Sequence, residues 1–293
     1  MSARTGTFER QASVFRDWVP AVEAGRYHLY ISWACPWAHR TAIGRLVMGL
    51  EDAVGLTAVD PIRDERGWRF SGGEYRDPLN GFEFLSEAYA ATEPAFAGRV
   101  STPVLWDRES GRIVNNESGE ILRMLLTDFA PLAQHPADLY PAALAERIDR
   151  VEQDLYDGLN NAVYRAGFAT TQEAYADDAR RVFATLDLLE HRLSESRYLM
   201  GDAITEVDWR AFTTLVRFDS VYYSHFKCNV RRIVDYPGLW GYTRELYQEP
   251  GIAATVRMDE IKAHYYRTHP SINPTGIVPI GPDLDFSAPH GRG

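Results

Sequence analysis

The feature that most restricts the folds open to this chain is a cysteine placed between a strand and a helix. Residues 27–34 (Tyr-His-Leu-Tyr-Ile-Ser-Trp-Ala) are rich in β-forming residues and predict a strand. Pro36 suits the first position of a helix, and Gly49 suits a helix end. Cys35 is therefore expected at the N-terminus of a helix over 37–49, where unpaired N–H groups and the helix dipole favour the reactive thiolate.

The segments that follow continue an α/β pattern. Three more strands and one more helix are expected, at residues 54–59, 103–106, 112–114 and 117–128. The last two strands flank an Asp-Arg-Glu-Ser-Gly turn and predict a hairpin. Residues 61–99 are expected to be irregular. The order predicts one α/β domain over 27–130, preceded by an N-terminal extension over 1–26.

The second half of the chain has the periodicity of helices. Apolar residues recur there at helical spacing, at Ile148, Val151, Leu155, Leu159 and Val163 and again at Val182, Leu186, Leu189 and Leu193. An all-helical domain is therefore expected over 131–268, followed by a Pro- and Gly-rich, extended or irregular tail over 269–293. Within that domain, Thr205 stands three residues before Asp208, which predicts a capped helix start.

Composition and charge exclude several classes of protein. The 293 residues are 45% hydrophobic and 25% charged, which is typical of a globular chain. The formal net charge of −10 repels phosphate backbones, so no nucleic-acid partner is expected. No run of about 18 apolar residues is present, and Met1–Trp18 has no apolar signal segment, so neither a membrane span nor secretion is expected.

The cysteine content indicates a reducing, cytoplasmic location. The chain has two cysteines, Cys35 and Cys228. They can in principle form one disulfide, but two cysteines in unlike contexts are not typical of a disulfide scaffold. Neither lies in a Cys/His cluster with ligand spacing, so no metal is expected, and no nucleotide cofactor is expected either.

Cys35 is the candidate nucleophile. A dithiol oxidoreductase would carry a second cysteine at the position of Ala38, so this chain has a monothiol that needs an external thiol to resolve a mixed disulfide. Glutathione is the abundant candidate for that co-substrate. The alternative for Cys35 is a buried structural role, which is the common fate of a lone cysteine and the role expected for Cys228.

A strand that begins with proline is the first candidate glutathione contact. Pro103 opens the third strand after Ser101 and Thr102, where it removes one ladder donor. If the Thr102–Pro103 peptide bond is cis, the Thr102 backbone faces outward and can pair with the peptide backbone of glutathione, next to Val104. The alternative is an ordinary strand-initiating proline.

The start of the helix at 117–128 is the second candidate contact. Ser118 and the helix N-terminus offer donors to a carboxylate, and Glu117 offers an acceptor to an ammonium group. Together they match the zwitterionic γ-glutamyl end of glutathione. The alternative is a capped helix with an acid in its first turn.

With these pieces in this order, the sequence resembles the glutathione transferase superfamily, and more closely its Xi class, the glutathionyl-hydroquinone reductases. The similar stretches span nearly the whole chain; they are residues 32–41, 99–107, 114–118, 160–169, 226–229, 264–266 and 272–279. The Cys-Pro-Trp-Ala run alone is moderately specific, whereas the set in this order is highly specific. Two positions depart from the family pattern: Thr102 replaces an apolar residue, and Trp33 replaces a tyrosine in the expected pocket wall.

The resemblance implies a thioredoxin-like domain followed by an all-helical domain, in a homodimer. It implies that glutathione reduces S-glutathionyl-hydroquinones, with Cys35 as the nucleophile. The remaining family residues fall on Trp68, Val104, Glu117 and Ser118 as glutathione contacts and on Tyr164 and Tyr265 as substrate contacts.

The cleavage of a carbon–sulfur bond explains why tyrosines and tryptophans are expected at the substrate site. Thiolate attack on an aryl thioether needs a leaving carbon that can carry charge, so the hydroquinone is expected to react as its keto tautomer and to depart as an enolate. Phenol O–H donors stabilise such an oxygen, which is the catalytic role expected for Tyr164 and Tyr265. Trp33 and Trp68 are the expected walls for the ring. Core packing is the alternative for each aromatic residue, least so for Trp68 in the polar segment 64–75.

Two other functions share parts of this pattern. An omega-like thioltransferase or dehydroascorbate reductase would use the same Cys35 and the same glutathione contacts. A transferase-like binding module without catalysis has no need of a thiol at a helix start, so the presence of Cys35 argues against it.

Overall fold

The computed structural model describes residues 6–293, which divide into two compact units. The sheet unit contains residues 11–138 and 254–264, and the helical unit contains residues 6–10, 139–253 and 265–293. Among the described residues, no helix is both long enough and apolar enough to cross a membrane. The expected α/β domain and the expected helical domain are both present.

The sheet unit is built on four strands. They are β1 (Tyr27–Ile31), β2 (Val54–Ala58), β3 (Val104–Asp107) and β4 (Arg112–Asn115), in the spatial order β2-β1-β3-β4. β1 runs parallel to β2 and antiparallel to β3, and β3 and β4 form the predicted antiparallel hairpin. All four strands lie where the sequence predicts them.

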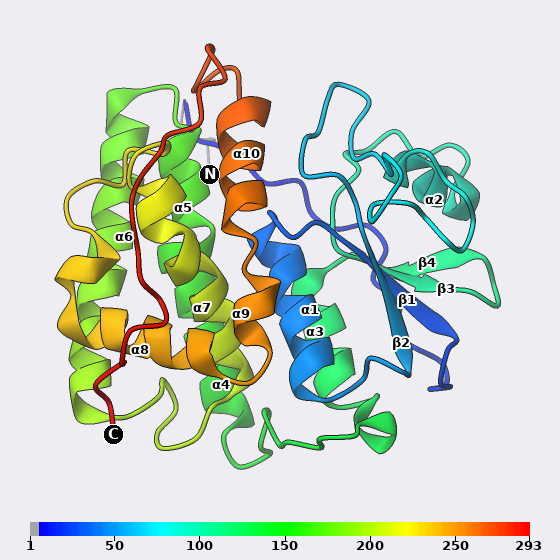
Figure 1. Ribbon diagram of the computed structural model, residues 1–293, viewed down its shortest axis with the longest axis horizontal. Helices are drawn as coiled ribbons and strands as arrows, with labels where there is room; N and C mark the ends of the chain where they lie inside the picture. The colour runs from blue at the N-terminus through cyan, green and yellow to red at the C-terminus, as the bar shows by residue number, and fades with distance from the viewer. Residues whose placement is uncertain (1–5) are drawn as a thin grey trace. The chain divides into compact units, whose positions relative to one another are not determined.

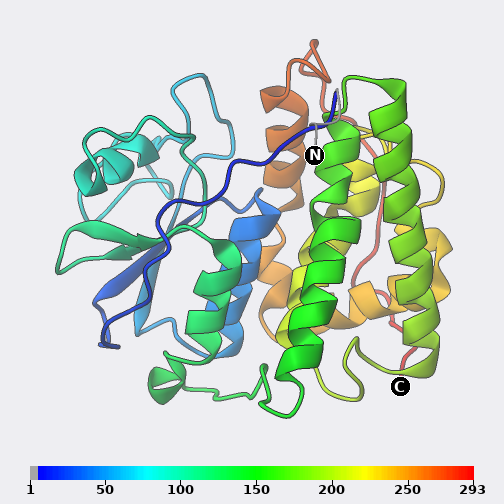
Figure 2. The same ribbon diagram turned by 180° about the vertical axis from the view of Figure 1, so that it is seen from behind.

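Two helices lie side by side along the sheet in both ribbon views (Figures 1 and 2). They are α1 (Pro36–Val47) and α3 (Ser118–Leu126), the two helices that the sequence predicts in this half. Their contact is close at Gly44, where an added Cβ would lie 2.5 Å from Leu122 Cδ1. The absent side chain therefore lets α1, the helix that Cys35 caps, approach α3 closely.

The segment expected to be irregular contains a helix, α2 (Leu85–Thr92), so that expectation was wrong. The Glu87 side chain accepts hydrogen bonds from the backbone N–H groups of Phe84 (2.8 Å) and Glu83 (2.7 Å), which satisfies donors at the helix start. Leu85 and Tyr89 are buried in a cluster with Trp106 of β3. The capping residue is Phe84 rather than Ser, Thr, Asp or Asn, so no usual cap marks this helix in the sequence.

The helical unit carries most of the remaining elements. They are α4 (Ala145–Leu155), the π-helix η2 (Tyr156–Asn160), α5 (Ala162–Gly167), α6 (Gln172–Glu195), α7 (Glu206–Arg217), the π-helix η3 (Phe218–Tyr222), the short η4 (Ile233–Asp235) and α8 (Pro237–Gln248). The sheet unit adds the short η1 (Ala130–Leu132). The boundary between the units falls inside α9 (Ile252–Thr255) and inside α10 (Met258–Thr268).

The predicted capping box at the start of α7 is confirmed. The Asp208 carboxylate accepts hydrogen bonds from the backbone N–H of Thr205 (2.7 Å) and of Leu199 (2.9 Å), and from the Tyr242 hydroxyl (2.7 Å). Burial raises the pKa of Asp208, and these hydrogen bonds oppose that effect. The carboxylate therefore joins the start of α7 to α8 as well as capping the helix.

The two units do not coincide with the expected boundaries at residues 26, 130 and 268. Residues 11–26 belong to the sheet unit, because the chain there runs beside the end of β4. Asp17 N–H donates to Val114 O at 3.1 Å, and Asn116 N–H donates to Phe15 O at 2.9 Å. Backbone pairing of this kind has no local sequence signal, which is why this segment was predicted to be an extension.

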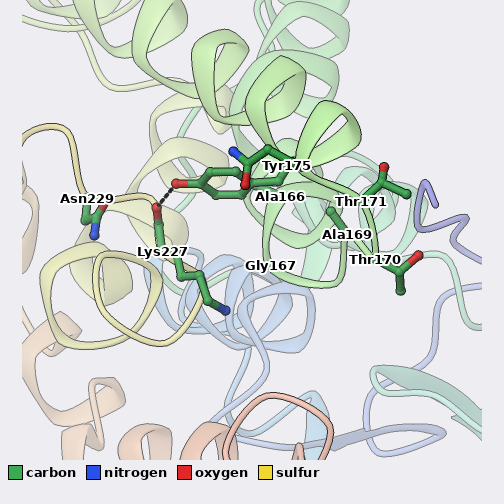
Figure 3. A pocket seen from close by; sticks show the side chains of 9 residues that line it. Ala166, Gly167, Ala169, Thr170, Thr171, Tyr175, Lys227 and Asn229 are labelled. Atoms are coloured by element: carbon green, nitrogen blue, oxygen red, sulfur yellow. Dashed lines mark hydrogen bonds between the residues drawn. The ribbon is translucent and has the colours of Figure 1, made fainter.

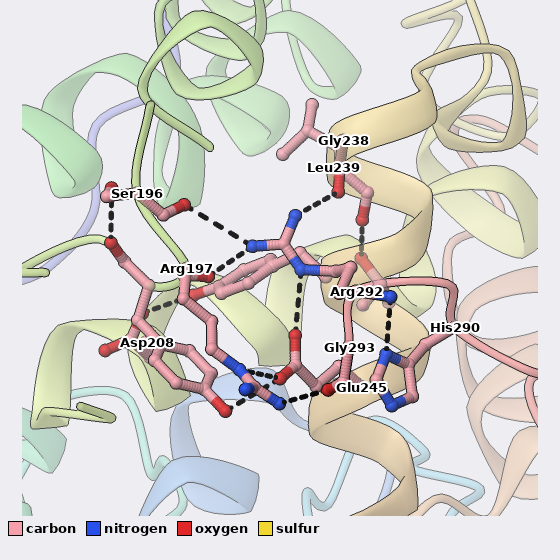
Figure 4. Close-up of polar contacts among 12 residues, drawn as sticks. Ser196, Arg197, Asp208, Gly238, Leu239, Glu245, His290, Arg292 and Gly293 are labelled. Atoms are coloured by element: carbon pink, nitrogen blue, oxygen red, sulfur yellow. Dashed lines mark hydrogen bonds and ion pairs between the residues drawn. The ribbon is translucent and has the colours of Figure 1, made fainter. Parts of the chain in front are cut away.

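The tail after α10 is extended, as predicted, and runs over the helices of its own unit (Figure 1). The Phe286 ring packs against Trp240 and Tyr247, with centroids 5.2 Å apart in both pairs. Figure 4 shows the polar anchor, in which Arg292 Nε donates to Glu245 Oε2 at 2.8 Å. Arg197 Nε donates to Glu245 Oε1 at 2.7 Å. One buried carboxylate thus holds the tail to α8.

Replacement of Glu245 by Gln is expected to lower the free energy of unfolding by about 2 kcal/mol, because it removes the charge from these hydrogen bonds. Arg197 is partly exposed, which keeps the effect below that of a fully buried pair. Urea unfolding at neutral pH measures the difference. The exposed Glu195→Gln is the matched control, and it should change stability by less than about 0.5 kcal/mol.

The pH dependence of this effect follows from the Glu245 pKa. Burial raises it, but hydrogen bonds from Arg197, Tyr198 and Arg292 outweigh burial, so the pKa in the folded protein lies below the ordinary 4.5. The contribution of Glu245 is therefore complete above pH 4.5 and is lost as the pH falls through the folded value. A stability difference between wild type and Glu245→Gln that stays constant into acid would contradict this assignment.

Candidate active site

Cys35 occupies the N-cap position of α1, as the sequence predicts. Its backbone is extended (φ −80°, ψ 119°), and Pro36 begins the helix. The Cys35 N–H donates to Ser32 O at 3.1 Å, and His39 N–H donates to Cys35 O at 2.9 Å. The thiol is partly exposed, and its Sγ lies 3.7 Å from Thr102 O. The sulfur is therefore fixed at the start of a helix whose first turn contains no acid.

The loop before β3 lies against this sulfur. The Thr102–Pro103 peptide bond is cis, which is the geometry that the sequence left open. Thr102 and Val104 are both buried, and Val104 pairs with Tyr30 of β1. Two residues that contact Cys35 through their backbone oxygens, Thr102 and Ser32, have buried hydroxyl groups with no hydrogen-bond partner among the described residues.

Arg63 is a basic residue near the nucleophile that the sequence analysis missed. Burial and the charge of Arg99 lower its pKa, whereas the charge of Cys35 raises it, so Arg63 lies within electrostatic range of both. Its guanidinium carbon is 5.7 Å from the ring centroid of Trp68. Arg63 is therefore a charged neighbour of the nucleophile. The sequence offers no signal for it beyond a basic residue in a loop.

Trp68 is 5% exposed and belongs to a buried cluster. It therefore packs in the core, although the polar sequence around it made a core role the less expected one. Its ring also stacks on His264 of α10, with centroids 5.0 Å apart at 18°. His264 Nδ1 is 2.7 Å from Pro61 O. Trp33 lies beneath Arg257, the residue just before α10, and the Arg257 guanidinium carbon is 5.1 Å from the Trp33 ring centroid. The two predicted pocket walls therefore contact residues in α10 or just before it.

Glu117 is itself the N-cap of α3. One carboxylate oxygen accepts from Gly119 N–H at 3.3 Å, and the other accepts from Ser13 Oγ at 2.9 Å. Ser118 is the first residue of the helix and is buried. Ser13 lies in the segment predicted to be an extension, and sequence reasoning did not identify its contact with Glu117, a candidate glutathione contact.

The two predicted tyrosines lie in the helical unit and are hydrogen-bonded to each other. Tyr164 comes from α5 and Tyr265 from α10, and their hydroxyl groups share a short hydrogen bond. A third tyrosine, Tyr222 of η3, lies 3.1 Å from Tyr265 between hydroxyl oxygens. Sequence reasoning missed Tyr222, since nothing distinguishes it from the other tyrosines of the chain. We refer to these three residues as the tyrosine cluster.

Burial is the main influence on the acidity of the cluster. It raises the pKa of Tyr222 and of Tyr265 well above 10, and the Tyr164 charge adds to this increase. The buried Arg217 at the end of α7 opposes it in both cases. These hydroxyl groups therefore keep their protons at neutral pH and can act as hydrogen-bond donors.

Each π-helix contains a member of the tyrosine cluster or ends a few residues before one. η3 contains Tyr222, and η2 ends at Asn160, four residues before Tyr164. The Asn160 side chain donates to Arg210 O at 2.7 Å and to Thr214 Oγ1 at 2.9 Å, which fixes η2 against α7. π-helical turns inside α-helices are frequent at functional sites.

The chain has extensive similarity to known transferases. A family model of the glutathione S-transferase N-terminal domain matches residues 34–127, and one of the C-terminal domain matches residues 172–245. Glutathionyl-hydroquinone reductase YqjG of Escherichia coli K-12 is 48% identical, over 98% of this chain and 92% of YqjG. Glutathionyl-hydroquinone reductase PcpF of Sphingobium chlorophenolicum is also 48% identical, over 94% of this chain and 90% of PcpF.

Solved structures give the same result. The glutathione-bound structure of YqjG superimposes with a TM-score of 0.92 at 48% identity, covering 95% of this chain and 96% of that one. A Xi-class transferase from Natrialba magadii superimposes with a TM-score of 0.95 at 51% identity, covering 99% and 92% of the two chains. The chain belongs to the Xi class of the glutathione transferases. The thioredoxin-like and helical domains of this class are the architecture expected from the sequence.

The predicted site residues of this Xi-class transferase are divided between its two units. Cys35, Trp68, Thr102 and Glu117 lie in the sheet unit, together with Trp33, Pro103, Val104 and Ser118. Tyr164 and Tyr265 lie in the helical unit. The structure therefore places the thiol next to Thr102 and in the same unit as the other candidate glutathione contacts, and it brings the tyrosines together in the helical unit.

Three further polar residues of the transferase, Cys228, His39 and Arg40, are explained by their structural surroundings. Cys228 is buried, and burial raises the pKa of its thiol to about 12, so it is not a nucleophile at neutral pH. His39 is buried and lies 2.7 Å from Thr255 Oγ1 through its Nε2. The Arg40 guanidinium lies over the Trp37 ring, 4.6 Å from its centroid. Both cysteines are free thiols.

The helical unit also has an open pocket of about 380 Å³ (Figure 3). Lys227 and Asn229, which belong to one of the family-like stretches, line it opposite the start of α6. The Tyr175 hydroxyl donates to Lys227 O at 2.6 Å across it. None of the predicted site residues lines this pocket. Within residues 6–293, no group of three or more His, Cys, Asp or Glu side chains is arranged to hold a metal ion.

Proposed function

We propose that the protein reduces S-glutathionyl-hydroquinones to hydroquinones, with glutathione as the reductant. The position of Cys35, a partly exposed thiol at the start of α1, carries this proposal. The high identity with two glutathionyl-hydroquinone reductases over nearly the full chain supports the substrate class. The overall reaction converts one glutathionyl-hydroquinone and one glutathione into hydroquinone and glutathione disulfide.

In the first step, the Cys35 thiolate attacks the sulfur of the thioether in the keto tautomer of the substrate. A bond forms between the two sulfur atoms, and the carbon–sulfur bond breaks. The electron pair of that bond moves onto the ring oxygen as an enolate, which is the phenolate of the hydroquinone. The enolate oxygen then takes a proton, and Cys35 is left as a mixed disulfide with glutathione.

Hydroxyl donors lower the cost of the charge on the departing oxygen. We assign this role to Tyr164 and Tyr265, whose hydroxyl groups are hydrogen-bonded to each other within the tyrosine cluster. Tyr222 is hydrogen-bonded to Tyr265 and can replace the proton that a donor gives up. Trp33 and Trp68 supply the aromatic walls for the ring in this scheme.

In the second step, the thiolate of a second glutathione attacks the mixed disulfide and leaves as glutathione disulfide. We assign the glutathione peptide backbone to Thr102, Pro103 and Val104, beside the Cys35 sulfur. The γ-glutamyl ammonium is assigned to Glu117, whose carboxylate has acceptor capacity beyond its two observed donors. The γ-glutamyl carboxylate of glutathione is assigned to Ser118 and the N-terminus of α3.

Mass spectrometry of the intact protein tests the assignment directly. Incubation with a glutathionyl-hydroquinone and no free glutathione should leave one glutathione on Cys35 and release hydroquinone in equal amount. Release of hydroquinone without an adduct on Cys35 would overturn the mechanism. Absence of release, with reduction of a glutathione mixed disulfide retained, would show a thioltransferase of the omega-like kind instead.

Introduction of a second thiol should shorten the life of the mixed disulfide. Ala38 is buried in the first turn of α1, at the position where dithiol enzymes carry the resolving cysteine. In Ala38→Cys, the new thiol should compete with glutathione for the Cys35 adduct and form an internal disulfide, so the trapped adduct becomes scarcer. Ala38→Ser is the matched control. An adduct as abundant as in wild type would mean that this position does not face the Cys35 sulfur.

The proposal also covers the oligomeric state of the protein and the redox state of its compartment. We propose a homodimer on the basis of the resemblance to the family, and sedimentation should then give twice the chain mass of 33.2 kDa. A reducing compartment suits the chemistry, because the second step consumes reduced glutathione.

A further inference from the structure

Arg10, in the short segment before the sheet unit, lies on the face of a tyrosine of the cluster. Its guanidinium carbon is 4.7 Å from the ring centroid of Tyr164. Its Nε donates to Asn161 Oδ1 at 2.9 Å, and this residue precedes α5. Arg10 is therefore held by its hydrogen bond to Asn161 and by the ring of a residue assigned to the reaction.

The chain before Arg10 is anchored to the same helical unit. Gly6 O accepts from Thr170 N–H at 3.0 Å. The Phe8 ring packs on Phe168, with centroids 5.2 Å apart, and Phe168 stacks in turn on Tyr164. Residues 6–10 thus lie along the loop between α5 and α6, and Arg10 is fixed rather than a freely moving surface cation.

A cation over the face of a phenol ring acts on its hydroxyl group. The positive charge is attracted to the electron-rich face and stabilises negative charge that develops on the ring and its oxygen. The hydroxyl therefore becomes a stronger hydrogen-bond donor. The Tyr164 hydroxyl is the one that bonds Tyr265, so the effect is felt at both assigned donors.

The charged and titratable groups around the cluster come from several elements. Arg217 of α7 acts on Tyr222 and Tyr265. His225 and His269 lie against the Tyr265 ring, and burial lowers the pKa of His225 to about 4, so His225 is neutral at working pH. Arg10 is the cation seated on Tyr164 itself.

We propose that Arg10 is a positioning residue of the reductive site, whose guanidinium strengthens Tyr164 as the donor to the departing enolate oxygen. This inference rests on the proposed reduction of glutathionyl-hydroquinones. It gives the segment before the sheet unit a part in the reaction. It also predicts that Arg10 affects the reduction of glutathionyl-hydroquinones but not of glutathione mixed disulfides, because a disulfide substrate releases a thiolate and has no enolate to stabilise.

Arg10→Met tests the proposal, since Met keeps an unbranched chain and removes the charge. The ratio of glutathionyl-hydroquinone turnover to mixed-disulfide turnover should fall by about tenfold, in kcat rather than in KM. The alkaline limb of the kcat profile should move to higher pH. Arg10→Lys, which keeps the charge, should recover most of the ratio. A parallel fall of both activities would overturn the proposal, because it would assign Arg10 to folding.

A double-mutant cycle tests whether Arg10 acts through the Tyr164 hydroxyl group. In a Tyr164→Phe background, Arg10→Met should have no further effect on the ratio, because the hydroxyl on which it acts is gone. A full additional tenfold loss there would overturn the link to Tyr164, as would an unchanged ratio in the single variant.

A measurement without substrate distinguishes failure of this inference from failure of the proposed function. The ultraviolet absorbance of wild type minus that of Tyr164→Phe reports the ionisation of Tyr164. The same difference taken in the Arg10→Met background should show ionisation at higher pH. If wild type does not cleave glutathionyl-hydroquinones, the proposed function fails while this shift remains. If cleavage occurs and the shift is absent, the inference about Arg10 fails alone.

Discussion

Replacement of Cys35 by Ser is expected to abolish reduction of glutathionyl-hydroquinones, a loss of at least about a thousandfold. The serine hydroxyl would occupy the same place at the start of α1 but is protonated at neutral pH and far less nucleophilic. The fold should be retained, because the thiol is partly exposed and its hydrogen bond to Thr102 O is weak, at 3.7 Å. Turnover and a thermal unfolding curve measure the two effects.

Cys228→Ser is the matched control for this prediction. Cys228 is buried and its pKa is about 12, so it takes no part in thiolate chemistry. The variant should keep nearly full activity and lose some stability, because a hydroxyl group replaces a sulfur at a buried position. Loss of turnover in Cys228→Ser with retention in Cys35→Ser would reverse the assignment of the nucleophile.

The part of the site that surrounds the nucleophile could be predicted because its signals are local. A strand, a cysteine and a proline in succession fix the start of α1, and Gly49 ends the expected helix close to the observed end at Val47. Thr102 and Pro103 likewise mark the start of β3 within a few residues. Such features depend on backbone preferences of adjacent residues, which the sequence contains directly.

The residues that were missed are joined by contacts across long stretches of sequence. Ser13 reaches Glu117 over 104 positions, and Arg10 reaches Asn161 over 151. Tyr222 joins Tyr265 only because η3 and α10 meet in the fold. No periodicity or spacing rule connects such pairs, so only the tertiary structure could identify them. The helix α2 was missed for a different reason, since its cap is not one of the usual residues.

Removal of a hydroxyl group from the tyrosine cluster is the second change for which we expect a large loss of activity. Tyr164→Phe and Tyr265→Phe each remove a hydroxyl group and keep the ring. Each variant should lose activity on glutathionyl-hydroquinones by roughly ten- to a thousandfold, if one donor contributes as much as an oxyanion donor usually does. Most of the glutathione mixed-disulfide activity should remain, because a thiolate leaving group needs no enolate stabilisation. Initial rates on the two substrates, measured for the same preparation, give the comparison.

Tyr222→Phe separates direct donation from support within the cluster. Its hydroxyl is bonded to Tyr265 and is fully buried, so it is assigned to proton replacement and its removal should cost less than removal of either assigned donor. Parallel loss of both activities in the Tyr164 and Tyr265 variants would mean that these residues support the glutathione site or the fold. Full retention of both activities would remove the tyrosines from the mechanism. The buried hydroxyl network would then be packing, stabilised by hydrogen bonds that any buried phenol must make.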